Sequence, residues 1–422
     1  MALAFSRSIR LLLTRRFGTY WFATLLANVG TWAQQVAQPW LLLQLGASPM
    51  LLGIDAFASG APALLLTLAG GALADRADRR RVIALCQSLQ MLCPIAIVAL
   101  LLAHGLQPWM VIACSLVIGV TDALSMPSFQ TIVAVLVSRR DLPTGISLNA
   151  TQFNLSRILG PALAGLLMAS VGVVGAYAVS AASYLPFIAV ALWALPRGRI
   201  AAAARGPAGV EAPAWRGTVD LLRPARLRLA IASVFFMGLF CSPLVTFCPL
   251  LVKATGADGV LRFSTAIAAF GVGGLLGATL LLGVDADRDR RGLASAGAAG
   301  FAAMVIVAAT APWPAWLPCW YLLEGLCMPL AGTGANADLH SATPPSSRGR
   351  AASLFMVAMR GGIGLGNLAA GALVATLGVR DALRLEGITG LVVLVLVGAA
   401  WRRAPAVACQ ASPFPLPPPA AT

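Results

Sequence analysis

Long apolar runs recur along this 422-residue chain, and they constrain its fold more than any other feature. A helix needs about 20 apolar residues to cross the roughly 30 Å of hydrocarbon in a bilayer. Only 11% of the residues are charged, against about 25% in soluble domains, so most of this surface is unsuited to water. The pattern predicts an all-α membrane protein with twelve transmembrane helices. The expected spans lie near 17–45, 51–74, 82–103, 109–137, 145–171, 173–195, 229–254, 261–284, 293–311, 314–339, 351–377 and 386–402.

The loops between these runs alternate in charge. Most arginines gather on the side that receives the N-terminus, the Arg76–Arg81 cluster and the Arg288–Arg291 cluster. Cytoplasmic loops carry such an excess, so both chain ends are expected in the cytoplasm of a bacterium, with the spans in its inner membrane. The net charge of +15 would also suit nucleic-acid binding, but its distribution among short loops argues against that. The first apolar run, 17–45, is too long for a cleavable signal peptide.

Three segments recur in the same order in the two parts of the chain. LMASVGV (167–173) matches LVATLGV (373–379), and GALADR (71–76) matches GVDADR (283–288). PWLLLQLGA (39–47) similarly matches PLLVKATGA (249–257). Two parallel six-helix repeats are a known plan of membrane transporters. We therefore expect pseudo-symmetric halves at 1–195 and 229–403, a cytoplasmic linker at 196–228 and a disordered Pro-rich tail at 404–422.

The segment GALADRADRRR (71–81) lies at the expected cytoplasmic end of the second span. It resembles the loop motif of the major facilitator superfamily, with Asp78 at a position usually held by glycine. The resemblance and the later repeat imply a cytoplasmic gate, in which an acid caps a helix or pairs with an arginine. The alternative is that the arginines only anchor the loop on its side of the membrane. The expected gate residues are Gly71, Asp75, Arg76, Arg79, Arg80, Asp287 and Arg288.

A second signature runs from 123 to 165 and holds Ser125 and Pro127, then Arg157 ahead of a Gly-Pro pair. It resembles the branch of bacterial facilitators that includes siderophore exporters and macrolide efflux proteins. The resemblance implies export of a small organic molecule against protons. Gly160, Pro161 and Gly165 look like the fifth-span motif of antiporters in this superfamily, although Ala164 departs from it. Ordinary close helix packing would use the same residues.

Four charged residues stand out at membrane depth: Asp122, Arg157, Glu324 and Arg360. Charges at membrane depth are costly and commonly functional. Asp122 and Arg157 lie at similar depths in successive spans and could pair. We hypothesise that at least one of the two acids carries a coupling proton. The alternative is that these charges form structural ion pairs.

The first span carries polar side chains at spacings of three and four residues, which places them on one helix face. These are Asn28, Thr31, Gln35 and Gln38, with Trp32 beside them. The first and fourth spans of the resembled fold line a central cavity, so this stripe is expected to face substrate. Interhelical hydrogen bonding is the alternative. Asp55, near the outer end of the second span, is expected to be interfacial. Further cavity residues are expected at Ser125, Asn149 and Gln152.

Several chemistries lack their residues in this sequence. A nucleotide-binding P-loop needs Gly-Lys-Ser/Thr, but Lys253 is the only lysine and Ala254 follows it. No Cys/His spacing typical of zinc and no catalytic constellation occurs, so we expect no metal, no cofactor and no enzyme activity. The sequence thus predicts a secondary exporter whose partners are the bilayer, protons and a small molecule, and a monomer is expected. A siderophore is the first expected substrate and a hydrophobic drug the second. A transport-inactive scaffold or sensor stays the remote alternative.

Overall fold

The computed structural model describes residues 8–138, 140–193, 222–254, 259–282, 289–311, 314–343 and 347–405, without the side chains of 67–76, 79 and a few other helical residues. Helices dominate these ranges, and no strand occurs within them. In chain order they are α2 (Arg15–Gln44), α3 (Pro49–Arg76), α4 (Arg79–Leu102), α5 (Pro108–Leu136), α6 (Leu142–Ser170), α7 (Val173–Trp193), α9 (Ala225–Cys241), α10 (Pro243–Thr246), α11 (Cys248–Lys253), α12 (Gly259–Leu282), α13 (Arg291–Thr310), α14 (Leu317–Ser341), α15 (Arg348–Leu377) and α16 (Val379–Arg403), with a 3₁₀ turn at Pro314–Trp316.

The expected seventh span is an interrupted helix rather than a continuous one. The helix α9 ends at Cys241, and the short helices α10 and α11 follow it after single-residue breaks. Pro243 opens α10 and Pro249 lies in the first turn of α11. Proline cannot donate a backbone hydrogen bond inside a helix but fits its first turn, so each proline restarts the helix in a new segment.

Ten of the described helical segments are long and apolar enough to cross a membrane. The long helices α2 and α14 fall outside that group. Both carry polar side chains along their length, such as Gln34 and Gln38 in α2 and Glu324 and Asp338 in α14. The all-α membrane fold expected from the sequence is confirmed, and the two long helices outside that group are the expected first and tenth spans.

The internal repeat extends to the backbone conformation of two interhelical turns. Gly172 separates α6 from α7, and Gly378 separates α15 from α16. Both glycines have a φ of 80°, a conformation that suits residues without a Cβ atom. The final helix begins at Val379, several residues before the expected start at 386.

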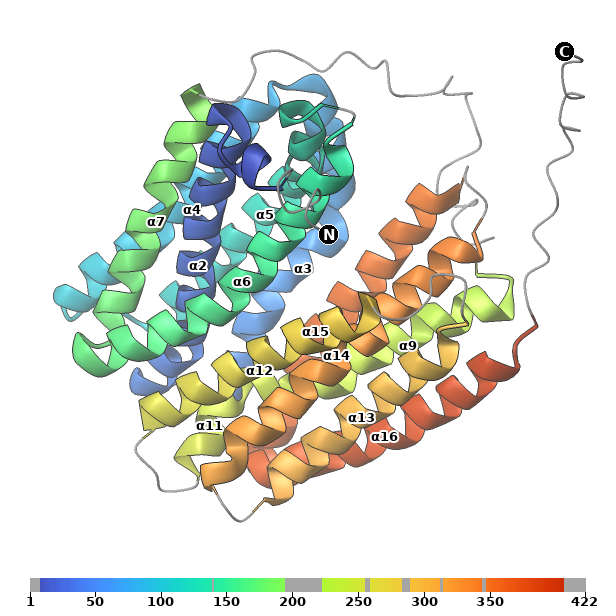
Figure 1. The fold of residues 1–422 in the computed structure, drawn as a ribbon. Coiled ribbons are helices and arrows are strands. Elements are labelled where there is room, and N and C mark those ends of the chain that lie inside the picture. The colour runs from blue at the N-terminus through green and yellow to red at the C-terminus, as the bar shows by residue number, and fades with distance from the viewer. Residues whose placement is uncertain are drawn as a thin grey trace, which may run out of the picture.

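The helices form two bundles, α2 to α7 and α9 to α16 (Figure 1). Within the first bundle α2 packs on α6 and α7, and α3 packs on α5. Within the second α12 packs on α14, and α13 packs on α14 and α16. The contacts between the bundles run mainly through α3 with α15 and α6 with α12.

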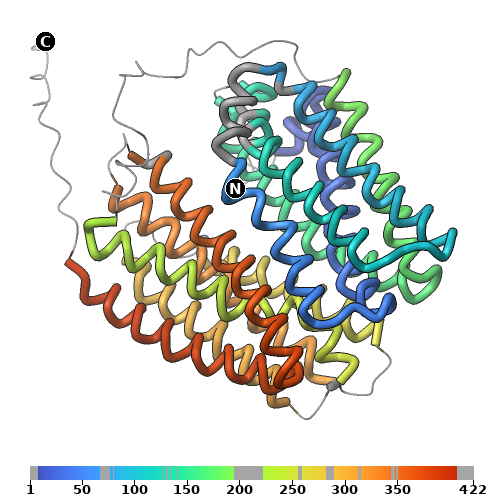
Figure 2. Tube along the Cα trace, turned by 180° about the vertical axis from the view of Figure 1, so that it is seen from behind, coloured from blue at the N-terminus to red at the C-terminus, as the bar shows by residue number. Residues whose placement is uncertain are grey.

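The bundles meet at one end and diverge toward the end where α2 begins and α16 ends, as both views show (Figures 1 and 2). We call the diverging end the termini side and the other the far side. One apolar cluster spans both bundles and includes Leu41 and Phe263. Two further clusters lie each within a single bundle, around Phe17 in the first and around Trp401 in the second. Apolar packing therefore joins the bundles on the far side.

Close backbone approach on the far side depends on glycines. A Cβ atom on Gly53 of α3 would lie 2.5 Å from the carbonyl oxygen of Asn367 in α15. A Cβ atom on Gly165 of α6 would lie 2.3 Å from the Cβ atom of Ser264 in α12. These distances are shorter than real Cβ contacts, so glycine is required at these two contacts between the bundles.

Candidate functional site

Arg157 lies at the middle of α6 and reaches from the first bundle to the second. Its guanidinium carbon lies 5.5 Å from the ring centre of Trp32 in α2 and 5.9 Å from that of Phe270 in α12. One of its Nη atoms lies 3.5 Å from the sulfur of Met328 in α14. Cations are attracted to aromatic ring faces, and a thioether is only a weak acceptor. We call Arg157, Trp32, Phe270 and Met328 the arginine cage.

Glycines bring the backbones around the arginine cage together. A Cβ atom on Gly160 would lie 2.4 Å from the Cβ atom of Trp32, and one on Gly271 would lie 2.6 Å from the carbonyl oxygen of Arg157. Pro161 follows Gly160 in the sequence and is also buried. The segment that resembles an antiporter motif, Gly160, Pro161 and Gly165, thus packs α6 against both α2 and α12.

Asp122 of α5 does not pair with Arg157 as the sequence suggested. Its carboxylate accepts a 2.8 Å hydrogen bond from the amide of Gln90 in α4. Arg360 of α15, in the other bundle, lies within electrostatic range of the same carboxylate. The two residues at similar depth therefore point to different neighbours, and the charge opposite Asp122 comes from the second bundle.

Glu324 of α14 is completely buried, and neither of its carboxyl oxygens has a hydrogen-bond partner in the described structure. Glu386 of α16 is 4% exposed, and its Oε2 atom also lacks a partner there. Both carboxyls act electrostatically on Cys241 of α9, so they share one region of the second bundle. Glu386 was not predicted as a site residue, because the charged residues Arg380, Asp381 and Arg384 just before it are typical of a loop.

Asp55 is buried rather than interfacial. Its two carboxylate oxygens accept hydrogen bonds of 2.7 Å from Gln38 of α2 and 2.6 Å from Ser115 of α5. Gln38 was expected to face a cavity, but its amide joins α2 to α3 and α5 instead. Thr31 similarly lies 3.2 Å from the hydroxyl of Tyr184 in α7. These two members of the polar stripe follow the alternative of interhelical hydrogen bonding.

The other expected cavity residues differ in exposure. Gln35 is exposed, whereas Asn28, Trp32 and Asn149 are partly buried. Ser125 and Gln152 are each 1% exposed. The Nε2 atom of Gln152 lacks a hydrogen-bond partner among the described residues. Gln35 is thus the exposed member of the α2 stripe, while Gln152 is a buried polar group with unused hydrogen-bonding capacity.

The expected gate residues fall mostly outside the described side chains. These are Gly71, Asp75, Arg76 and Arg79, whose side chains are not described, and Asp287 and Arg288, which lie outside the described residues. Arg80 is described, and it donates a 2.7 Å hydrogen bond to the carbonyl oxygen of Leu192 in α7. The Asp78 side chain accepts from the Arg80 backbone N–H and caps α4. Asp78, noted only as a departure from the motif, therefore has a structural task.

The second bundle repeats this arrangement. Asp289 accepts from the backbone N–H of Arg291 at the start of α13. Arg291 donates to the carbonyl oxygens of Trp401 and Ala404 at 3.0 and 2.8 Å. Hydrogen bonding to the Arg291 guanidinium holds the pKa of the Asp289 carboxyl below its usual value. Each bundle thus ties its third helix to the end of its sixth by an arginine.

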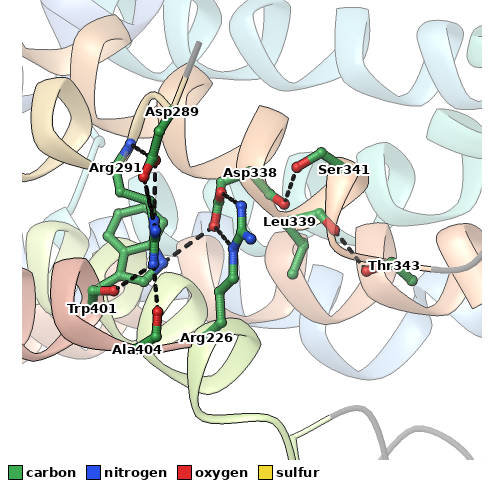
Figure 3. A network of polar contacts seen from close by, with 9 residues as sticks. All are labelled: Arg226, Asp289, Arg291, Asp338, Leu339, Ser341, Thr343, Trp401 and Ala404. Atoms are coloured by element: carbon green, nitrogen blue, oxygen red, sulfur yellow. Dashed lines mark hydrogen bonds and ion pairs between the residues drawn. The ribbon is translucent and has the colours of Figure 1, made fainter. Parts of the chain in front are cut away.

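A further ion pair reinforces the termini side of the second bundle (Figure 3). Asp338 of α14 pairs with the Arg226 guanidinium of α9 through two contacts, one of them a 3.1 Å hydrogen bond. The indole N–H of the fully buried Trp401 donates a 3.2 Å hydrogen bond to the same carboxylate. Four helices, α9, α13, α14 and α16, are therefore joined by one set of polar contacts. Asp338 and Arg226 were not among the residues predicted from the sequence.

Comparison with known proteins places this geometry in a family. A family model described as transmembrane secretion effector matches residues 9–419. The multidrug efflux pump Tap of Mycolicibacterium fortuitum is 32% identical over 168 residues, 39% of this chain and 41% of that protein. The staphyloferrin A transporter of Staphylococcus aureus is 29% identical over 175 residues, 41% of this chain and 44% of that protein. These two matches span less than half of either relative.

A longer match covers most of the chain. The gallate transporter of Pseudomonas putida is 26% identical over 379 residues, 83% of this chain and 82% of that protein.

Solved structures share the fold at low identity. A mutant of the nucleoside transporter NupG aligns with a TM-score of 0.74 at 13% identity, covering 92% of this chain and 99% of that one. A bacterial homologue of the lysosomal transporter Spinster aligns with a TM-score of 0.70 at 14% identity, covering 92% and 96%. Together with the near-complete family match, these likenesses agree with the two helical bundles described above. The chain belongs to the transmembrane secretion effector family of the major facilitator superfamily and is a multi-pass membrane transporter, not an enzyme.

Proposed function

We propose that the chain is a secondary active exporter of a small organic molecule, a siderophore in the first place, driven by proton antiport. The segment between α7 and α9 joins its two six-helix halves, and both chain ends face the cytoplasm of a bacterium. The arginine-rich loops on the termini side support that orientation. Divergence of the bundles on this side and their packing on the far side suit an inward-facing state of alternating access.

The observation that carries the proton-coupling part is Glu324. A buried ionised carboxylate without a hydrogen-bond partner is strongly disfavoured, so such a group is stable when it holds a proton. A change of conformation that admits water would allow the proton to leave. Glu386, close to the same thiol of Cys241, adds a second carboxyl to this part of the second bundle.

The relatives support two substrate classes. Similarity to the staphyloferrin A transporter favours a siderophore, and similarity to Tap favours multidrug efflux as the second candidate. Partial burial of the positively charged Arg157 at the contact between the bundles suits an anionic substrate better than a cationic drug.

A deletion strain grown under iron limitation tests the substrate. We expect less siderophore in the medium and more inside the cells, with both levels restored by a plasmid copy of the wild-type gene. Unchanged secretion together with new sensitivity to hydrophobic antibiotics would favour the second candidate instead. Unchanged secretion and unchanged sensitivity would count against both.

Glu324→Gln is expected to abolish proton-coupled transport. The amide keeps the size of the side chain but cannot release a proton, so substrate-dependent proton movement in proteoliposomes should fall to the background level. Asp381→Asn is the matched control, because Asp381 is an exposed carboxylate of α16 that pairs with Arg384. Full proton coupling in the Glu324→Gln protein would contradict the assignment of Glu324.

A further inference from the structure

Arg157 differs from the arginines that stabilise the second bundle. Arg226 pairs with Asp338, and Arg291 pairs with Asp289. Arg157 instead has two aromatic rings and a thioether sulfur as its neighbours, and no carboxylate of the described structure bonds to it. A guanidinium stays charged at any physiological pH, so this is a partly buried cation without an anionic partner. A cation in such a place is poised to take its counter-charge from a ligand.

The rings of the arginine cage leave the hydrogen-bonding capacity of Arg157 largely unused. Trp32 and Phe270 stabilise the positive charge through their ring faces but accept no ordinary hydrogen bond. A guanidinium has five N–H donors, and within the described part of the chain the sulfur of Met328, a weak acceptor, is the hydrogen-bond partner of Arg157. The remaining donors form a fork that matches the two oxygens of a carboxylate.

The arginine cage lies where transporters of this plan bind their substrates. Its four residues belong to the middle turns of α2, α6, α12 and α14, two helices from each bundle. Sites near the bilayer midplane, between repeats, allow one bound molecule to sense the movement of both repeats. The close packing enforced by Gly160 and Gly271 fixes the two backbones that carry Trp32 and Arg157.

We propose that Arg157 binds the carboxylate of the transported molecule, and that the arginine cage thereby selects aromatic carboxylic acids over neutral and cationic compounds. This inference rests on the proposed function and names its substrate class. The aromatic character follows from Trp32 and Phe270, and the ring centre of Phe153 lies 6.2 Å from that of Trp32. A lipophilic cation would meet repulsion from Arg157 in the same place.

The test compares an acid with its uncharged ester. Binding of 2,3-dihydroxybenzoate and of methyl 2,3-dihydroxybenzoate to the purified full-length protein is measured by calorimetry. Arg157→Gln is expected to weaken binding of the acid about 10- to 100-fold, the loss of a charge-assisted hydrogen-bonded pair, and to change ester binding less than threefold. Arg157→Lys should fall between, because lysine keeps the charge without the fork. Arg384→Gln, at an exposed pair on α16, is the control and should leave both ligands unaffected.

Two outcomes would overturn the proposal. One is that Arg157→Gln lowers the affinity for the acid and for the ester equally while the melting temperature of the protein stays unchanged. The other is a wild-type protein that binds neither probe, or binds the ester as tightly as the acid. Transport is scored separately in vesicles. If the wild-type protein binds the acid through Arg157 but does not export it, the exporter function is refuted and the binding site stands. If the acid is exported equally well by the wild-type and Arg157→Gln proteins, the binding site alone is refuted.

Discussion

Replacing Asp338 by alanine is expected to lower the free energy of unfolding by about 3–5 kcal/mol, the usual cost of removing one partner of a buried ion pair. The Asp338 side chain is 3% exposed and that of Arg226 is 15% exposed, so the guanidinium left behind would lie largely away from water. The indole N–H of Trp401 would lose its acceptor as well. A marked fall in the apparent melting temperature of the detergent-solubilised protein is the expected readout.

Asp381→Ala is the matched control for this prediction. Its carboxylate also pairs with an arginine, Arg384, but the two side chains are 64% and 39% exposed. Exposed ion pairs contribute about 0–1 kcal/mol, so this variant should melt close to the wild type. Equal melting temperatures for the two alanine variants would contradict a stabilising role of the Asp338 contacts.

Gly53→Val is expected to reduce transport at least about tenfold while leaving the protein folded. The added side chain would meet the carbonyl oxygen of Asn367 and the Cα atom of Gly371, both part of the α15 backbone. Overpacking of this kind costs about 1–3 kcal/mol, and 1.4 kcal/mol corresponds to a factor of ten. Since the cost falls on the contact between the bundles, it should disfavour the far-side-closed state. Initial efflux rates from loaded vesicles measure the effect.

Gly60→Val on the same helix is the control, because no atom lies within 4 Å of its added Cβ position. It carries the same helix-propensity change without the interbundle overlap. Transport by the Gly53→Val protein at the rate of the Gly60→Val protein would show that closure of the far side tolerates a side chain there.

The spans could be predicted from the sequence because bilayer thickness sets a minimum apolar length. Positions of α2 to α7 agree with the expected spans within a few residues. The break in the seventh span and the early start of α16 were not predicted. The break was missed because Pro243 and Pro249 lie within an otherwise apolar run. The early start of α16 was missed because Asp381 and Arg384 are charged, although they form an ion pair within the helix.

The candidate site was predicted only in part, since depth along a helix does not say which way a side chain points. Arg157 and Glu324 were singled out because charges at membrane depth are rare. In the structure Arg157 reaches Phe270 of the other bundle, and Glu324 is buried without a hydrogen-bond partner among the described residues. Their neighbours could not be inferred, because Phe270 and Met328 come from helices more than a hundred residues away. Gln38 and Asp55 show the same limit, since their hydrogen bond depends on how α2 and α3 rotate against each other.

In each bundle an arginine at the start of the third helix donates to a backbone carbonyl at the end of the sixth, and this shared contact bears on the evolution of the chain. Arg80 holds Leu192, and Arg291 holds Trp401, at equivalent places in the two copies. A contact preserved in both copies is most simply inherited from one ancestral six-helix gene product, older than the duplication that joined them. Trp401 also donates its indole N–H to Asp338. Leu192, at the equivalent place in the first bundle, has no such donor, so this contact belongs to the second copy alone. After the fusion, the copies were free to diverge into unequal partners.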